Sequence, residues 1–179
     1  ALSAANLTAI PAANITGTLP AISGANLTGF TSSQMPAGSV IQVVNAKTNT
    51  SVSMSSNTLT DTGLTATITP SSTSSKILVL LHQNGLRKNS NHVNNDIRVE
   101  LQRGGTLIHL PCTYAGFTGT AISMVLASVS TSYLDSPSST SAVVYKTQFR
   151  NPDGGAAGGT IMAQESGAES TITLMEIAG

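Results

Sequence analysis

Few residues in this sequence have the types and spacing that catalysis or metal binding requires. The three histidines match neither an HExxH motif nor the Cys/His spacing of a zinc site. No serine lies in a GxSxG elbow, where an α/β-hydrolase carries its nucleophile. The acidic residues are Asp61, Asp96, Glu100, Asp135, Asp153, Glu165, Glu169 and Glu176. They form no paired-carboxylate motif of the kind that a glycoside hydrolase uses. We therefore predict a protein that is not an enzyme, with no catalytic residue, cofactor or metal site.

Two local features have both a chemical and a structural interpretation. Cys112 is the only cysteine, so it forms no disulfide within the chain. Burial as a small apolar side chain is favoured over a reactive thiol, because no cationic neighbour marks it. Asn94, Asn95 and Asp96 offer oxygen ligands that calcium accepts, but no EF-hand loop surrounds them. A solvated turn is the favoured interpretation of this triplet.

Polar residues with binding chemistry gather in three segments, at residues 85–95, 112–120 and 151–158. The first is rich in hydrogen-bond donors suited to sugars or anionic groups, and the second supplies aromatic faces for stacking. The candidate receptor-binding residues are Arg87, Lys88, Asn91, His92, Tyr114 and Phe117. The alternative is that all three segments are plain solvated connections. Loops held on a rigid frame are a common place for binding residues, so the frame decides whether these segments meet.

The expected frame is an antiparallel β-sandwich or jelly roll over residues 37–179. Apolar residues alternate with polar ones or form short runs, broken by Gly, Pro, Asn and Ser. We expect strands at 40–44, 64–69, 76–81, 97–102, 106–110, 121–134, 142–150, 159–163 and 170–177. The run Ile77 to Leu81 is typical of a centrally buried strand. No segment has the pattern of a capped amphipathic helix.

The placement of the three polar segments depends on the strand count. If every strand crosses the sandwich once, the three segments share one end. The short connections at 71–75, 104–105, 136–141 and 165–169 then share the other end. On this count the last strand finishes beside the three polar segments. If both ends of the sandwich chain lay at the stalk, the polar segments would therefore lie at the stalk as well. An error of one strand reverses that conclusion.

Residues 1–36 have a different pattern, which predicts a repetitive extended stalk. Asn-Leu-Thr or Asn-Ile-Thr triplets recur, and an aliphatic side chain returns every three to five residues. Pro11 and Pro20 oppose a helix, and no charged residue occurs before Lys47. The expected axial residues are Leu7, Ile10, Ile15, Leu19, Ile22 and Leu27. A thin segment cannot bury these side chains against itself, so we expect three chains wound together; a flexible linker is the alternative.

Composition restricts the partners. Hydrophobic residues make up 40% of the chain and charged residues 9%, whereas about 25% of a typical soluble domain is charged. The formal net charge is zero, so the basic surface that nucleic acid requires is absent. No apolar run approaches the length of a membrane helix, so we expect no membrane insertion. The start at Ala1, without Met or a signal peptide, is typical of a fragment or processed piece of a longer protein.

Several of these segments resemble known proteins. LSAANLTAIPAANITGTLPAISGANLTGF (residues 2–30), YLDSPSSTSAVVYKTQFRNPDGG (133–155) and STITLMEIAG (170–179) are similar to bacteriophage tail-fibre and related virion proteins, many of them from aquatic phages. DIRVELQRGGTLIHLPCTY (96–114) and the closing strand resemble the jelly roll of complement globular heads and tumour-necrosis-factor-type trimers. The resemblance covers nearly the whole chain. It implies a virion location outside the cell, upstream fibre or tail proteins as partners, three-fold assembly and both termini at the stalk.

The sequence thus leads us to expect a non-enzymatic virion attachment protein. It would be the distal part of a phage tail fibre, a homotrimer that binds a host cell-surface glycan or outer-membrane protein multivalently. One alternative is a purely structural capsid or tail decoration fibre, which would bind no cell surface. Another is a polysaccharide depolymerase or esterase, which would release product from host polysaccharide.

Overall fold

The computed structural model describes residues 34–89, 93–122, 124–153 and 159–179. The expected stalk, with Leu7, Ile10, Ile15, Leu19, Ile22 and Leu27, lies outside the described residues. The described part is all-β, with every strand pair antiparallel and no α-helix among these residues, as the sequence predicts. It belongs to one compact unit within residues 31–179.

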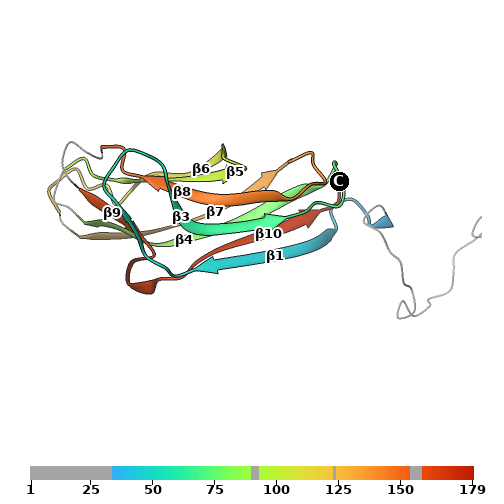
Figure 1. Ribbon diagram of the computed structural model, residues 1–179, viewed down its shortest axis with the longest axis horizontal. Coiled ribbons are helices and arrows are strands. Elements are labelled where there is room, and N and C mark those ends of the chain that lie inside the picture. The colour runs from blue at the N-terminus through green and yellow to red at the C-terminus, as the bar shows by residue number, and fades with distance from the viewer. Residues whose placement is uncertain (1–33, 90–92, 123, 154–158) are drawn as a thin grey trace, which may run out of the picture. The chain divides into compact units, whose positions relative to one another are not determined.

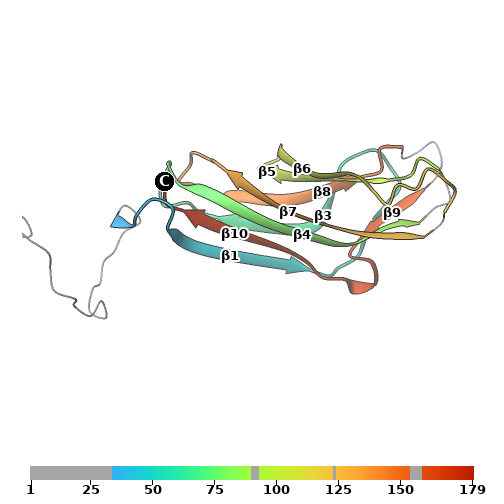
Figure 2. The same ribbon diagram turned by 180° about the vertical axis from the view of Figure 1, so that it is seen from behind.

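Two sheets lie face to face (Figures 1 and 2). Sheet A contains β1 (Val40–Thr48), β2 (Val52–Met54), β4 (Lys76–Asn89), β7 (Val125–Asp135), β9 (Thr160–Ala163) and β10 (Ser170–Ile177). Sheet B contains β3 (Thr60–Ile68), β5 (Ile97–Arg103), β6 (Thr106–Ala115) and β8 (Val143–Arg150). The order is β1-β10-β4-β9-β2 in sheet A, with β7 on β4 as well, and β3-β8-β5-β6 in sheet B.

Period-two alternation explains which residues enter the core. In β3, Leu64, Ala66 and Ile68 are buried and the intervening threonines are exposed. The side chains of a strand point alternately to its two faces, so one apolar row faces sheet A and one polar row faces solvent. The expected strand Ile77–Leu81 is central in sheet A but is not buried on both faces, because Leu80 is exposed on the outer side.

The core consists of two hydrophobic clusters separated by a polar layer. Along β4 the first cluster ends at Leu81 and the second begins at Leu86. Between them, Gln83 Nε2 donates to Ser170 Oγ at 3.0 Å, and Thr147 Oγ1 donates to Gln83 Oε1 at 2.9 Å. These groups are fully buried and hydrogen-bonded, so the layer avoids the cost of burying unpaired polar atoms.

β9 and β10 run in the same direction, one after the other, because both pair antiparallel with β4. A 3₁₀ turn, η5 (Glu165–Gly167), joins them beside β4. Gly85 makes room for it: a Cβ there would lie 2.6 Å from the backbone nitrogen of Glu165. The connection at 165–169 therefore does not return the chain at an end of the sandwich, which corrects the expected placement and removes one crossing from the strand count.

With one crossing fewer, the last strand finishes at the same end of the sandwich at which the first strand begins (Figure 1). Gly38 N donates to the Ala178 carbonyl at 2.8 Å, and Ser74 Oγ donates to the Gly179 carbonyl at 3.4 Å. We call this end, which also carries residues 104–105 and 136–142, the terminal end. The opposite end, which we call the loop end, carries residues 93–96, 116–122 and 151–153. The start of β1 and the finish of β10 thus both lie at the terminal end, opposite the long polar segments.

Candidate binding surface at the loop end

The loop end is assembled by hydrogen bonds between segments that are far apart in the sequence. Asn151 N donates to the Ser56 carbonyl at 3.2 Å, and Asn151 Nδ2 donates to Asn95 Oδ1 at 2.9 Å. Lys88 Nζ donates to Thr118 Oγ1 at 2.9 Å. These contacts bring together the connections β2–β3, β4–β5, β6–β7 and β8–β9. The described parts of the three polar segments therefore meet at one end of the fold.

The predicted donors Arg87 and Lys88 are not in an exposed loop, because β4 continues to Asn89. Arg87 is ion-paired with Glu165 of η5, and both side chains are largely buried. Lys88 is fully buried. The prediction of a loop over residues 85–89 is therefore wrong: pairing with β7 and β9 extends the strand through these polar residues. Asn91 and His92, the other predicted donors of this segment, lie outside the described residues.

Tyr114 and Phe117 are exposed and adjacent, as stacking faces must be. Their exposed fractions are 67% and 49%, and their ring centroids lie 5.9 Å apart at an angle of 63°. The turn that joins them is closed by a hydrogen bond from Phe117 N to the Tyr114 carbonyl at 3.2 Å. Because β6 runs to Ala115, Tyr114 extends from the end of a strand, and Phe117 follows in the connection to β7. Their receptor-binding role stays a prediction.

Charged groups are buried directly beneath this surface. Burial lowers the pKa of Lys88, and attraction to Asp96 opposes that shift. Burial and the neighbouring Asp153 carboxylate raise the pKa of Asp96 to about 6, while Lys88 acts in the opposite direction. Asn95 and Asp96 are both buried, so the prediction of a solvated turn at this triplet is wrong for these two residues. A local pattern of polar residues cannot reveal burial that distant loops produce.

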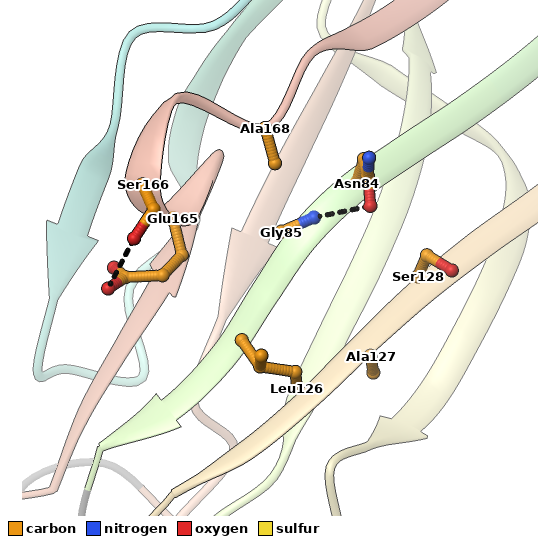
Figure 3. A pocket seen from close by; sticks show the side chains of 8 residues that line it. All are labelled: Asn84, Gly85, Leu126, Ala127, Ser128, Glu165, Ser166 and Ala168. Atoms are coloured by element: carbon orange, nitrogen blue, oxygen red, sulfur yellow. Dashed lines mark hydrogen bonds between the residues drawn. The ribbon is translucent and has the colours of Figure 1, made fainter.

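A second feature, which the sequence patterns do not indicate, is an open groove of about 450 Å³ on the outer face of sheet A (Figure 3). β4 forms its floor at Gly85, η5 forms one side and β7 the other. Its lining residues are Asn84, Gly85, Leu126, Ala127, Ser128, Glu165, Ser166 and Ala168. The groove offers amide, hydroxyl and carboxylate groups beside the exposed Leu126, which suits a small polar ligand such as a sugar.

A third feature is an apolar row that crosses the outer face of sheet A near the terminal end. Strand register places Val43, Met175, Leu78 and Leu134 side by side on β1, β10, β4 and β7. Val43 is 55% exposed and Leu134 51% exposed, while Met175 and Leu78 between them are half-buried, so the single chain covers this row only in part. Contiguous exposed apolar residues on a sheet mark surfaces that bind another protein.

The remaining chemical groups of the described residues do not converge. No three His, Cys, Asp or Glu side chains in the described ranges form a metal-binding cluster. Cys112 is half-buried against the second hydrophobic cluster, in agreement with its interpretation as a small apolar side chain. His82 and His109 bond to Ser130 and Thr131, which are hydroxyl neighbours on β7. Within the part of the chain that the structure describes, no helix is long and apolar enough to cross a membrane.

Comparison with known proteins identifies no family for this chain. No protein-family model matches the chain, and no curated protein matches it.

Proposed function

We propose that this protein is the distal part of a phage tail fibre and attaches the virion to a host cell-surface glycan or outer-membrane protein. In this proposal residues 1–36 form a three-chain stalk and residues 37–179 form a jelly-roll tip. The protein acts as a homotrimer and performs no catalysis. The proposal is supported by the resemblance of the repeat and the closing segments to tail-fibre proteins, and by the arrangement of the sandwich.

The observation that carries the proposal is the position of the polar segments. They gather at the loop end, and the first and last strands of the sandwich begin and finish at the terminal end. Residues 1–36 precede β1, so a stalk joins the sandwich at the terminal end. A fibre tip with this arrangement presents its binding groups away from the virion.

The jelly-roll assignment is supported by the strand order. β1-β10-β4-β7 in one sheet and β3-β8-β5-β6 in the other place the first and last strands side by side. Such an order requires long connections that pass from one sheet to the other, as in double-sheet jelly rolls. β2 and β9 extend the first sheet toward the loop end.

The trimer is supported by apolar surface that one chain leaves exposed. The row through Val43 and Leu134 crosses the outer face of sheet A near the terminal end. The β6–β7 edge of the sandwich also exposes Leu107, Leu110 and Leu126. A face on one copy and an edge on the next are different surfaces, so their contact is heterologous, and it forms a closed ring when the rotation between copies is one third of a turn. We propose that a second copy of this chain covers the row.

Multivalency explains how such a tip would hold a cell. A single site on a sugar or protein surface can be weak, because few polar contacts offset the cost of association. Three linked sites act at high effective concentration, and repeated fibres on one virion raise it further. Firm adhesion then requires no deep pocket.

The proposal is tested with labelled fibre on a panel of bacterial cells and on a glycan array. On the cell or glycan that binds the parent best, the double variant Tyr114→Ala/Phe117→Ala should bind at least about tenfold more weakly, since stacking contributes about 1–3 kcal/mol per ring. Val144→Ala, which removes an exposed apolar side chain from sheet B, serves as the control and should bind normally. Both variants should keep the parental mass and melting temperature.

Three outcomes would contradict parts of the proposal. Absence of binding to every cell and glycan would favour a decoration fibre. Release of soluble product from host polysaccharide would favour a depolymerase or esterase. Unchanged binding by the double variant would move the receptor site away from these rings, with the groove at Asn84 and Ser128 as the next position to test.

A further inference from the structure

Two arginines lie side by side at the loop end, on the outer face of sheet B. Arg98 of β5 and Arg150 of β8 are directly opposite each other in the strand register. Their neighbours Val99 and Phe149 are buried in the core, so both arginines point away from sheet A. The Cβ atoms of directly opposed residues are about 5 Å apart, and like charges in such a pair repel each other.

A buried carboxylate neutralises one of the two charges. Glu100 lies two residues farther along β5, and its Oε1 atom is 2.9 Å from Arg98 Nε. The next acidic residue on this face, Asp61, pairs with Lys146 at 2.8 Å. Two guanidinium groups and one carboxylate therefore leave a single positive charge at this position.

Arg150 provides that charge. The other three arginines of the chain, Arg87, Arg98 and Arg103, form ion pairs with carboxylates. Among the described residues, the Arg150 side chain bonds only to a neutral group, since its Nη1 atom donates to Asn57 Oδ1 at 2.7 Å. A guanidinium group has five N–H donors, and a half-buried one with so few acceptors suits an anion that arrives from outside.

The exposed aromatic pair continues the same row of sheet B (Figure 1). β6 pairs with β5 on both sides of Arg98 but has one extra residue there, in a β-bulge that contains Tyr114. Ala115, the next residue, is buried in the core, so Tyr114 points to the outer face. Neighbouring strands are about 5 Å apart, so Arg150, Arg98 and Tyr114 form a row about 10 Å long across β8, β5 and β6. Phe117 packs edge-on to Tyr114 at the aromatic end of this row.

We propose that this row binds an acidic sugar, with Arg150 and Arg98 on its carboxylate and Tyr114 against its ring. The inference rests on the proposed function, because it uses the receptor-binding surface at Tyr114 and Phe117 and names a uronic-acid glycan as its ligand. The planar guanidinium fork matches a carboxylate in shape, and one net positive charge complements its single negative charge. A phosphate monoester carries up to two negative charges at neutral pH and fits this balance less well.

Matched acidic and neutral oligosaccharides test the ligand class directly. The full chain is titrated with oligosaccharides that contain galacturonate, glucuronate or mannuronate, and with their methyl esters, which keep the sugar and remove its charge. For at least one of the three we expect the acid to bind at least about tenfold more tightly than its ester. The preference should shrink as NaCl rises from about 0.02 to 0.5 M, because salt screens partly exposed charges.

Variants of Arg150 locate the carboxylate. Arg150→Gln should remove the preference for the acid and keep the parental melting temperature, since the fold loses only a bond to the neutral Asn57. Arg150→Lys keeps the charge but not the planar fork, so it should bind the acid at least about threefold more weakly than the parent. Lys76→Gln removes the same charge from the exposed start of β4 at the terminal end and should keep the parental affinity.

Equal affinity of the parent for acid and ester in all three sugars, or an unchanged preference in Arg150→Gln, would overturn the inference. Tighter binding of a sulfated or phosphorylated oligosaccharide than of any uronate would overturn it as well, because the site would then belong to another oxyanion. Cell adhesion separates this inference from the proposed function. If Tyr114→Ala/Phe117→Ala lost adhesion while the parent showed no preference for acids, only this inference would fail. Acid binding without adhesion to any cell would support it and contradict the proposed function.

Discussion

Replacing Glu176 with Gln should destabilise the sandwich strongly, although the two side chains have nearly the same shape. Glu176 is fully buried on β10 at the terminal end. Its Oε1 accepts from Ser71 N at 2.7 Å, Ser71 Oγ at 2.5 Å and Ser75 Oγ at 2.7 Å. Its Oε2 accepts from Gln42 Nε2 at 2.5 Å. The carboxylate thus links β1, the β3–β4 connection and β10.

The magnitude follows from these four bonds. In the variant, three bonds at one oxygen become bonds to a neutral acceptor, and the new amide group opposes the Gln42 amide. Bonds to charged groups contribute about 1.5–3 kcal/mol and neutral ones about 1 kcal/mol, so we expect a total loss of about 3 kcal/mol. For a domain of this size the melting temperature should fall by about 10 °C. Glu169→Gln, at an exposed ion pair with Lys47, should change it by less than about 2 °C.

The pH dependence supplies a second check. Burial alone would raise the pKa of Glu176, but the hydrogen bonds from Ser71, Gln42 and Ser75 outweigh it and lower the pKa. The unfolded chain therefore binds this proton more readily than the folded one. The stabilisation is complete above the ordinary glutamate pKa of about 4.3 and is lost as pH falls through the lower folded pKa.

Thermal melts of parent and variant from pH 7 down to about pH 3 should thus converge in acid. A Glu176→Gln protein that melts within about 2 °C of the parent at pH 7 would refute the reasoning, because the four bonds would then contribute no net stability. So would a melting difference that is the same at every pH, since it would not depend on the carboxylate charge.

Two further predictions concern packing and assembly. Gly85→Ala should lower the stability by about 2–4 kcal/mol, because the new Cβ would meet the backbone of Glu165. Gly105→Ala, where nothing lies within 4 Å, should cost only about 1–2 kcal/mol of backbone strain at its positive φ, so equal melting temperatures would contradict this account. Val43→Glu should convert a trimer into monomers by light scattering, because it buries a charge in the proposed interface, whereas the matched Val144→Glu should stay trimeric. A trimeric Val43→Glu protein would place the interface elsewhere.

Most strands could be predicted because their signal is local. Alternation at Leu64, Ala66 and Ile68 decides which side of β3 is buried, whatever the neighbouring strand is. The last strand was predicted at its observed bounds, Ser170–Ile177. The short β2 was missed, since Val52–Met54 has too few residues to establish a period. β1 and β6 extend beyond the predicted ranges because pairing partners continue past the apolar residues.

The candidate site was predictable in composition but not in exposure. Tyr114 and Phe117 are both exposed, but β6 continues through Tyr114, which the sequence placed in a connection. Arg87 and Lys88 have the same donor chemistry in the sequence, yet Glu165 pairs with one and loops of distant origin cover the other. Exposure depends on atoms that arrive from elsewhere in the chain, so no local pattern specifies it.

Composition and periodicity by themselves determined the all-β class and the positions of most strands. Only the tertiary structure decided that β9 and β10 cross the sandwich together, because both pair with β4, from which they are about 70 to 100 residues away in the sequence. This arrangement places the polar segments at the loop end, opposite the start of β1 and the finish of β10. It also buries Asp96 at the loop end, where desolvation raises the pKa of its carboxyl group.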